Sequence, residues 1–133
     1  MDSPQKVLVI DDDEILLGAV RRLLTAAGLE VVTSISALHL PKLMQREKPD
    51  LVLLDIEMPQ LSGEHVLDLT NLFDFLRATP IVLHSAKSEE ELQSLVARSN
   101  AVGYIKKTGN PVSLVAQVKA FLPARQPEPE PEA

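Results

Sequence analysis

The sequence predicts an α/β fold: a doubly wound (βα)5 three-layer sandwich with a five-stranded parallel sheet between two layers of helices. Short aliphatic runs alternate along the chain with longer stretches in which apolar residues lie three and four positions apart. The aliphatic runs are continuous, which indicates strands that are covered on both faces. With 133 residues and 45% hydrophobic content, the chain suits one domain with a buried core.

The runs that we expect to form strands are short and rich in valine, leucine and isoleucine. They are VLVI at 7–10, LEVVTSI at 29–35, LVLLD at 51–55, PIVLHS at 80–85 and VGYIK at 102–106. In folds of this kind, ligands bind beyond the carboxyl ends of the strands, where the strand order reverses. Functional residues are therefore expected at the strand ends.

The first two expected helices follow the first two strands. One begins near Asp13 and ends at Gly28, because an acid caps a helix start and glycine suits the position after a helix end. Its apolar stripe comprises Leu16, Val20, Leu23 and Ala27. The second helix runs from about Ala37 to Lys48, with Pro41 in its first turn, where the missing N–H is tolerated.

Three further helices are expected after the third, fourth and fifth strands. The third helix occupies 64–76, and the fourth begins at Ser88, which is placed to form a capping box with Glu91. The fifth begins with Asn110 as the cap and Pro111 at the first helical position. Its buried residues are expected to be Leu114 or Val115, Val118, Phe121 and Leu122.

The composition excludes several classes of protein. Without cysteine, the chain forms neither disulfides nor thiolate metal sites. No apolar run approaches the roughly 18 residues that span a membrane, and residues 1–6 lack the features of a signal peptide, so we expect a cytoplasmic protein without a membrane partner. The net charge of −6 provides no basic surface for direct nucleic-acid binding.

The C-terminal segment differs in composition from the rest. Four of the ten prolines lie between Pro123 and Pro131, and they alternate there with glutamates. Proline prevents helix formation and favours an extended chain. We therefore expect a folded domain over 1–122 and a disordered tail or linker over 123–133.

Polar side chains end four of the five expected strands. They are Asp11 and Asp12, Asp55, Ser85, and Lys106 and Lys107. The carboxyl ends of parallel strands share one edge, so three carboxylates would meet there and repel each other unless a hard divalent cation lay between them. Carboxylate oxygens suit Mg²⁺, or Mn²⁺. Ordinary polarity at a strand end explains one such acid well and three poorly.

A lysine and a hydroxyl beside that cation would complete a site for a phosphoryl group. Asp55 is the expected acceptor, because a carboxylate can act as a nucleophile and its phosphate would be held by the cation, the ammonium and the hydroxyl. Asp13 and Glu14 are better explained as helix-capping acids. His84 lies inside an apolar strand and has no metal-ligand spacing with the other histidines, which favours a structural role.

Four motifs contain these residues, namely VLVIDDDE, PDLVLLDIEMPQLSG, PIVLHSA and VGYIKKT. Together they resemble the receiver domains of two-component response regulators, the family of the chemotaxis regulators, over residues 6–122. The resemblance implies a flavodoxin-like fold with strand order 2-1-3-4-5. It implies a phosphoacceptor domain of a phosphorelay, which is not an enzyme beyond catalysing its own phosphorylation and dephosphorylation.

The resemblance also implies roles for individual residues. Asp55 becomes phosphorylated, and Mg²⁺ is held by Asp11, Asp12, Asp55 and the backbone carbonyl of Glu57. Ser85 contacts the phosphoryl oxygens and Lys107 forms an ion pair with the site. Ser85 and Tyr104 then form the switch, in which the hydroxyl moves towards the phosphoryl group and the aromatic ring turns inward.

Four residues near the site are open to more than one interpretation. Glu57 and Lys87 correspond to family positions that set the lifetime of the phosphoryl group, and they could instead pair with each other. Lys106 competes with Lys107, but alternation along the strand favours Lys107. Thr108 stands where the family usually has a proline after the lysine, so we expect a trans peptide bond or a strained loop.

The resemblance implies a sensor histidine kinase or phosphotransfer protein as donor and an output partner that binds around helix four, strand five and helix five. It leaves a homodimer open. One alternative is a receiver fold that docks or dimerises without phosphorylation. A haloacid-dehalogenase-like phosphatase is a remote alternative, suggested by the spacing of Asp11 and Asp13. No output domain follows Leu122, so we expect a stand-alone regulator or the front of a longer protein.

Overall fold

A five-stranded parallel sheet forms the centre of the computed structural model, which describes residues 3–38, 40–59, 61, 65, 68, 71, 79–108 and 112–124. The strand order is β2-β1-β3-β4-β5. The strands are β1 (Lys6–Ile10), β2 (Glu30–Ser34), β3 (Leu51–Asp55), β4 (Ile81–Ser85) and β5 (Gly103–Lys106). The expected doubly wound fold and its strand order are confirmed.

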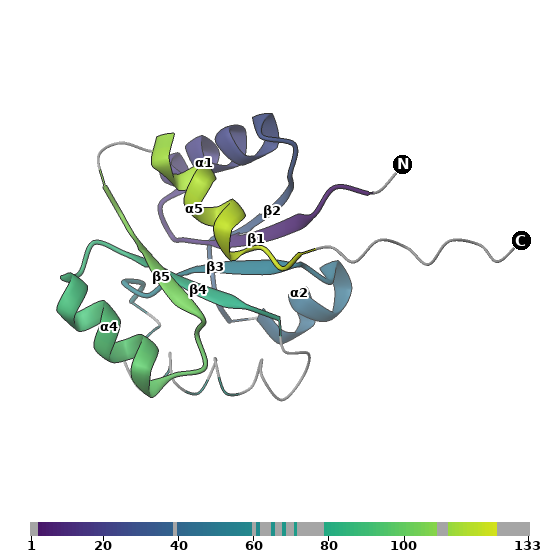
Figure 1. The fold of residues 1–133 in the computed structure, drawn as a ribbon. Coiled ribbons are helices and arrows are strands. Elements are labelled where there is room, and N and C mark those ends of the chain that lie inside the picture. Colours follow the sequence, from purple (N-terminus) through teal and green to yellow (C-terminus); the bar gives the residue numbers. More distant parts are fainter. Residues whose placement is uncertain are drawn as a thin grey trace, which may run out of the picture.

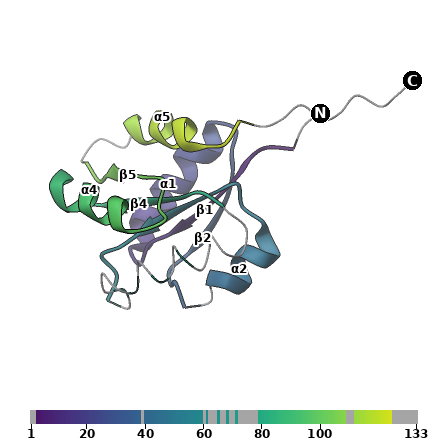
Figure 2. The ribbon, with the colours of Figure 1, turned by 60° about the horizontal axis from the view of Figure 1, so that its bottom comes forward.

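Helices cover both faces of this sheet. They are α1 (Glu14–Ala26), α2 (Leu40–Glu47), α4 (Glu89–Arg98) and α5 (Val112–Phe121). Figure 1 shows α1 and α5 on one side of the sheet and α2 and α4 on the other, and Figure 2 shows the same layers after rotation. None of the helices in the described part of the chain is both long and apolar enough to cross a membrane.

Each strand supplies side chains to two separate hydrophobic cores. In β1, Val7 and Val9 pack on the side of α1 and α5, whereas Leu8 and Ile10 pack on the side of α2 and α4. Every residue of β3 and β4 is buried. This two-sided burial is the physical reason for the continuous aliphatic runs in the sequence.

The apolar stripe of α1 differs from the expected one. The buried side chains are Leu17, Val20 and Leu24, whereas Leu16 and Leu23 are only partly buried. The leucines occur as adjacent pairs, so helical periodicity fits either member of each pair. Packing against the sheet selects the second member, and the expected stripe through Leu16, Leu23 and Ala27 was wrong by one position.

Side chains and glycine define the helix ends as expected at three positions. Oδ1 of Asp13 accepts hydrogen bonds from the backbone N–H groups of Ile15 and Leu16, at 3.0 and 3.1 Å, and so caps α1. Gly28 follows that helix with φ of +92°, a conformation that favours glycine. Ser88 Oγ accepts from the N–H of Glu91 at 3.2 Å and caps α4. These local contacts confirm the predicted starts of α1 and α4.

The remaining helices agree in part with expectation. Helix α2 begins at Leu40, later than expected, and Pro41 does lie in its first turn. In α5 Leu114 is buried and Val115 only partly so, which resolves that alternative. The expected third helix lies outside the described residues except for three isolated positions, and so do Asn110, Pro111 and the tail from residue 125 onward.

Candidate functional site

Three carboxylates meet at one edge of the sheet, beyond the carboxyl ends of two neighbouring strands. Asp11 and Asp12 follow β1, and Asp55 is the last residue of β3, which pairs with β1. Each supplies a carboxylate oxygen, and these oxygens all lie within 4.8 Å of one another. Asp11 and Asp55 are each only 2% exposed, whereas Asp12 is exposed. The convergence expected from strand topology is therefore present.

Backbone amides hold two of these carboxylates in place. Oδ1 of Asp11 accepts from the N–H of Asp13 at 3.0 Å, and Oδ1 of Asp55 accepts from the N–H of Glu57 at 3.0 Å. Each contact closes a tight turn just after a strand, which restricts the rotation of the side chain. The acids are thus preorganised by the chain that follows them.

Lys107 neutralises part of the negative charge. Its Nζ lies 3.0 Å from Oδ2 of Asp11 and 3.3 Å from Oδ1 of Asp55. Its backbone N–H donates to the carbonyl of Ser85 at 2.7 Å, which ties this residue to the end of β4. Lys106 is exposed, and the peptide bond before Thr108 is trans. The lysine expected from strand alternation is therefore the one beside the acids.

Burial and the neighbouring charges shift two pKa values. Burial raises the pKa of Asp55, and the nearby Asp11 carboxylate raises it further, against the lowering effects of the Glu57 N–H and of Lys107. Burial alone would lower the pKa of Lys107, but the Asp11 and Asp55 carboxylates outweigh it and raise that pKa. The two shifts have opposite consequences, because the surroundings favour the neutral form of Asp55 and the charged form of Lys107.

The residues present fit a divalent metal ion. Oδ2 of Asp11 is buried, and Nζ of Lys107 lies 3.0 Å from it. Three carboxylates share this one lysine, and a hard cation would offset the repulsion that remains between them. The three side chains all offer carboxylate oxygens, and Asp12 is open to solvent. This arrangement suits a Mg²⁺ ion that keeps several water ligands.

Ser85, at the end of β4, is completely buried and has two hydrogen-bonding partners. Its Oγ donates to Oε1 of Glu57 at 2.8 Å and accepts from the backbone N–H of Lys87 at 3.0 Å. The Nζ of Lys87 lies 3.8 Å from Oε2 of Glu91. Glu57 and Lys87 thus have other partners, and the pairing between them that the sequence left open is not present.

Tyr104 lies in β5 at the side of the sheet that α4 covers. It is half-buried against the core of that side, and its hydroxyl accepts a long hydrogen bond of 3.5 Å from Nε2 of Gln93 in α4. Sequence reasoning did not identify Gln93, because nothing in the local pattern of α4 marks which polar residue reaches a neighbouring strand. The same reasoning missed the contact between the Glu57 side chain and Ser85.

His84 lies next to the site in sequence, but it lies on the side of the sheet that α1 and α5 cover. It pairs with Asp55 across β3 and β4, and it is only 5% exposed. Burial lowers the pKa of His84 to about 4, with a further contribution from Lys107, so the imidazole is neutral near pH 7. Its burial agrees with the expected structural role.

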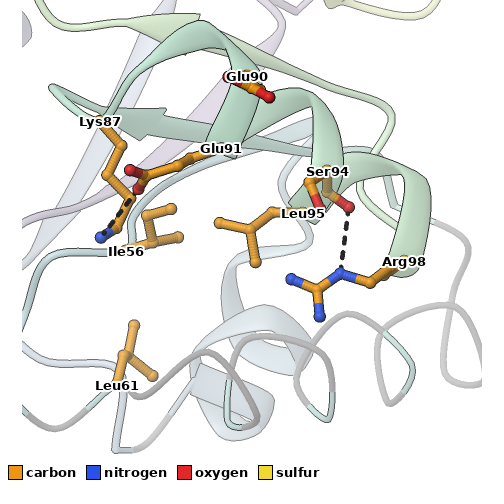
Figure 3. Close-up of a pocket in the computed structure, with 8 residues that line it drawn as sticks. All are labelled: Ile56, Leu61, Lys87, Glu90, Glu91, Ser94, Leu95 and Arg98. Carbon is orange, nitrogen blue, oxygen red and sulfur yellow. Dashed lines mark hydrogen bonds and ion pairs between the residues drawn. The ribbon is translucent and has the colours of Figure 1, made fainter.

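A cavity of about 510 Å³ adjoins the acidic site without containing its aspartates. Figure 3 shows the pocket between helix α4 and the side chains of Ile56 and Leu61, with Lys87 before the start of the helix and Arg98 at its far end. The chemistry of the site therefore lies at the strand ends, and this cavity is a neighbouring surface feature.

Comparison with known proteins agrees with this geometry. The sequence model of the response regulator receiver domain matches residues 7–119. The chain is 26% identical over 119 residues to the polar-differentiation response regulator DivK of Brucella anthropi, covering 90% of this chain and 97% of that protein. It is 32% identical over 120 residues to the transcriptional regulatory protein PrrA of Mycobacterium tuberculosis, covering 90% of this chain but only 51% of PrrA. The chain thus spans about half the length of that relative.

Solved structures give the same answer. The chemotaxis protein CheY4 of Vibrio cholerae matches with a TM-score of 0.76 at 25% identity, covering 90% of this chain and 99% of that one. The BeF3-activated receiver domain of RstA from Klebsiella pneumoniae matches with a TM-score of 0.74 at 28% identity, covering 87% and 97%. None of these comparisons supports a haloacid-dehalogenase-like phosphatase. Given the family match over 7–119, the fold and the acidic strand ends, the chain belongs to the response regulator receiver domain family, a family of signalling modules.

Proposed function

We propose that this domain accepts a phosphoryl group on Asp55 from a histidine kinase or phosphotransfer protein and so switches a surface that an output partner reads. The observation that carries the proposal is the meeting of three carboxylates with the Lys107 ammonium at the edge where Ser85 also ends its strand. A structural role alone would not favour so much buried negative charge.

Oδ2 of Asp55 is the nucleophile in this proposal. Oδ1 is engaged by the N–H of Glu57 and by Lys107, whereas no described residue bonds to Oδ2. Oδ2 attacks the phosphorus atom, the bond from phosphorus to the donor's nitrogen or oxygen breaks, and the leaving group takes the electron pair. The product is an acyl phosphate on Asp55, and water later hydrolyses it.

The neighbouring residues stabilise the charge that the phosphoryl group brings. Asp11, Asp12, Asp55 and the backbone carbonyl of Glu57 would hold Mg²⁺, or Mn²⁺, and the ion would neutralise phosphoryl oxygens when bound. Two carboxylates already position the ammonium of Lys107, so it can pair with a phosphoryl oxygen without a large movement. Ser85 supplies a hydrogen bond to a phosphoryl oxygen.

The output of the switch rests on Ser85 and Tyr104. When the Ser85 hydroxyl moves towards the phosphoryl group, it leaves space that the Tyr104 ring can fill, which breaks the long contact to Gln93. The surface of α4, β5 and α5 changes as a result and binds an output protein, an output domain or a second copy of the chain. Cytoplasmic kinases and regulators are the expected partners.

Intact mass after incubation with Mg²⁺ and acetyl phosphate tests the proposal. Wild type should gain one phosphoryl group, and Asp55→Asn should gain none. Asp12→Asn, which leaves the nucleophile in place, should gain it more slowly and with a weaker dependence on Mg²⁺. A wild-type protein that gains no phosphoryl group from acetyl phosphate or phosphoramidate would contradict the proposal.

A further inference from the structure

The hydroxyl of Ser85 has no spare proton in this structure. A serine hydroxyl has one proton to donate, and here that proton goes to Oε1 of Glu57 at 2.8 Å, while a lone pair accepts from the N–H of Lys87 at 3.0 Å. Ser85 is 0% exposed, so both contacts are made away from bulk water. A phosphoryl oxygen can accept a hydrogen bond from this hydroxyl only if Glu57 no longer accepts it.

The position of Glu57 places its carboxylate beside the acceptor. Its backbone N–H is bonded to Oδ1 of Asp55 at 3.0 Å, while its side chain reaches the hydroxyl at the end of the neighbouring strand β4. One residue therefore bridges the nucleophile and the hydroxyl that are to hold the phosphoryl group between them. The carboxylate takes the hydrogen bond that a phosphoryl oxygen would need.

We infer that the Glu57 carboxylate is a built-in competitor of the phosphoryl group, which holds Ser85 in the unphosphorylated arrangement until an incoming phosphoryl oxygen displaces it. This inference rests on the proposed function and adds a regulatory role of the side chain. No covalent bond changes in the exchange: the Ser85 proton stays on Oγ, and its hydrogen bond passes from Glu57 to a phosphoryl oxygen.

Two physical effects oppose the incoming group. A hydrogen bond from a neutral hydroxyl to a carboxylate is stronger than one between neutral groups, so breaking it reduces the net free energy of phosphoryl binding. The carboxylate also repels the negative charge of the phosphoryl oxygens at short range. Release is feasible because Glu57 is exposed as a residue, and its carboxylate can swing into water.

Lys87 does not hold the competitor in place. Its Nζ lies 3.8 Å from Oε2 of Glu91, and Figure 3 marks this contact between the two side chains near the start of α4. Within the described part of the chain, the hydrogen-bonding partner of the Glu57 side chain is Ser85. Removing the Glu57 side chain should leave its backbone N–H and carbonyl in place, so the tie to Asp55 and the expected metal ligand both survive.

The test is the affinity of the purified chain for beryllofluoride with Mg²⁺, measured by fluorine NMR, because beryllofluoride mimics a phosphoryl group without being consumed. Glu57→Ala should bind about tenfold more tightly than wild type, which corresponds to about 1.4 kcal/mol. Glu57→Gln should gain less, about threefold, because its amide oxygen still accepts from Ser85 while the charge is gone. Glu90→Ala, which removes one exposed negative charge from α4, is the matched control and should bind like wild type.

A double-mutant cycle shows whether the effect passes through the hydroxyl. In a Ser85→Ala background, removal of the Glu57 side chain should gain less than about threefold, because only charge repulsion remains. Thermal unfolding of each variant checks that it is folded. Glu57→Ala and Glu90→Ala binding equally would overturn the inference while leaving the proposed function standing, whereas no binding by any variant would overturn both.

Discussion

Nζ of Lys107 lies 3.0 Å from Oδ2 of Asp11, a carboxylate that is only 2% exposed. The two residues come from opposite ends of the chain and meet because β1 and β5 end at the same edge of a parallel sheet. The ammonium therefore occupies the position where a cation is needed most. Because of this contact, the free energy of unfolding of the domain should depend on the charges at the site.

Lys107→Met should destabilise the metal-free domain by about 2 kcal/mol, because it leaves two buried carboxylates without their counter-charge. The side chain of Lys107 is 20% exposed, so the loss should fall below that of a fully buried pair. Mg²⁺ should reduce the difference from wild type, since the ion replaces the missing charge. Urea unfolding with and without Mg²⁺ measures both effects, and a difference that grows on adding Mg²⁺ would count against the site.

The same variant gives a prediction about pH. The folded-state pKa of Lys107 is raised, so its stabilising effect is fully present below its ordinary value of 10.5 and is lost only as pH rises through the raised value. The stability difference between wild type and Lys107→Met should thus be nearly constant between about pH 7 and 9. A marked fall of the difference within that range would contradict the assigned direction.

Asp55→Asn should unfold at a temperature equal to or a few degrees above that of wild type in the absence of Mg²⁺. The pKa of Asp55 is raised above 3.8, so its ionised form reduces the free energy of unfolding once pH exceeds that raised value. The amide removes this effect, and each kcal/mol shifts the melting temperature by about 4 °C in a domain of this size. Differential scanning calorimetry at pH 7 is the measurement. A large loss of stability would refute the view that the ionised Asp55 carboxylate destabilises the metal-free domain.

His84 should make the domain sensitive to mild acid. Its pKa is about 4 in the folded state and near 6.5 in the unfolded state, so below pH 6.5 the unfolded chain binds a proton that the folded chain does not. Stability should fall by up to about 1.4 kcal/mol per pH unit from this residue, until the loss levels off near pH 4. His84→Gln should flatten the urea-derived stability profile over that window, and parallel profiles for the two proteins would exclude the effect.

Tyr104 offers a direct optical probe of the switch, because the chain contains one tyrosine and no tryptophan. Beryllofluoride with Mg²⁺ should reduce the quenching of its fluorescence by acrylamide, since the half-buried ring moves inward. Asp55→Asn should show no such change. Unaltered quenching in wild type that does bind beryllofluoride would mean that the ring does not move.

Gly103 and Gly18 should respond in opposite ways to alanine. A Cβ at Gly103 would meet the Phe121 ring at 2.5 Å, so Gly103→Ala should destabilise the domain by about 1–2 kcal/mol through overpacking. A Cβ at Gly18 meets nothing within 4 Å, and this position lies inside α1, so Gly18→Ala should stabilise by about 0.5–1 kcal/mol. Thermal unfolding compares the two, and the same sign for both would be inconsistent with this packing.

The pattern of residues was enough to predict the five strands and the four described helices in their order along the chain, and the last residues of β1, β3, β4 and β5. This was possible because burial on both strand faces and helical periodicity are short-range patterns. Asp11, Asp12 and Asp55 could be assigned to one sheet edge because parallel strands linked by crossovers must end there together. Alternation along β5 was enough to select Lys107 over Lys106.

The contacts between side chains followed only from packing in three dimensions. Helix α1 could bury either leucine of each adjacent pair, and only packing against the sheet selected Leu17 and Leu24. The sequence does not show which acceptor the Ser85 hydroxyl donates to. In the structure the Glu57 side chain, which follows β3, reaches this hydroxyl at the end of β4 and accepts its hydrogen bond. Such contacts join residues far apart in sequence and depend on side-chain torsions and local burial, which no short-range pattern encodes.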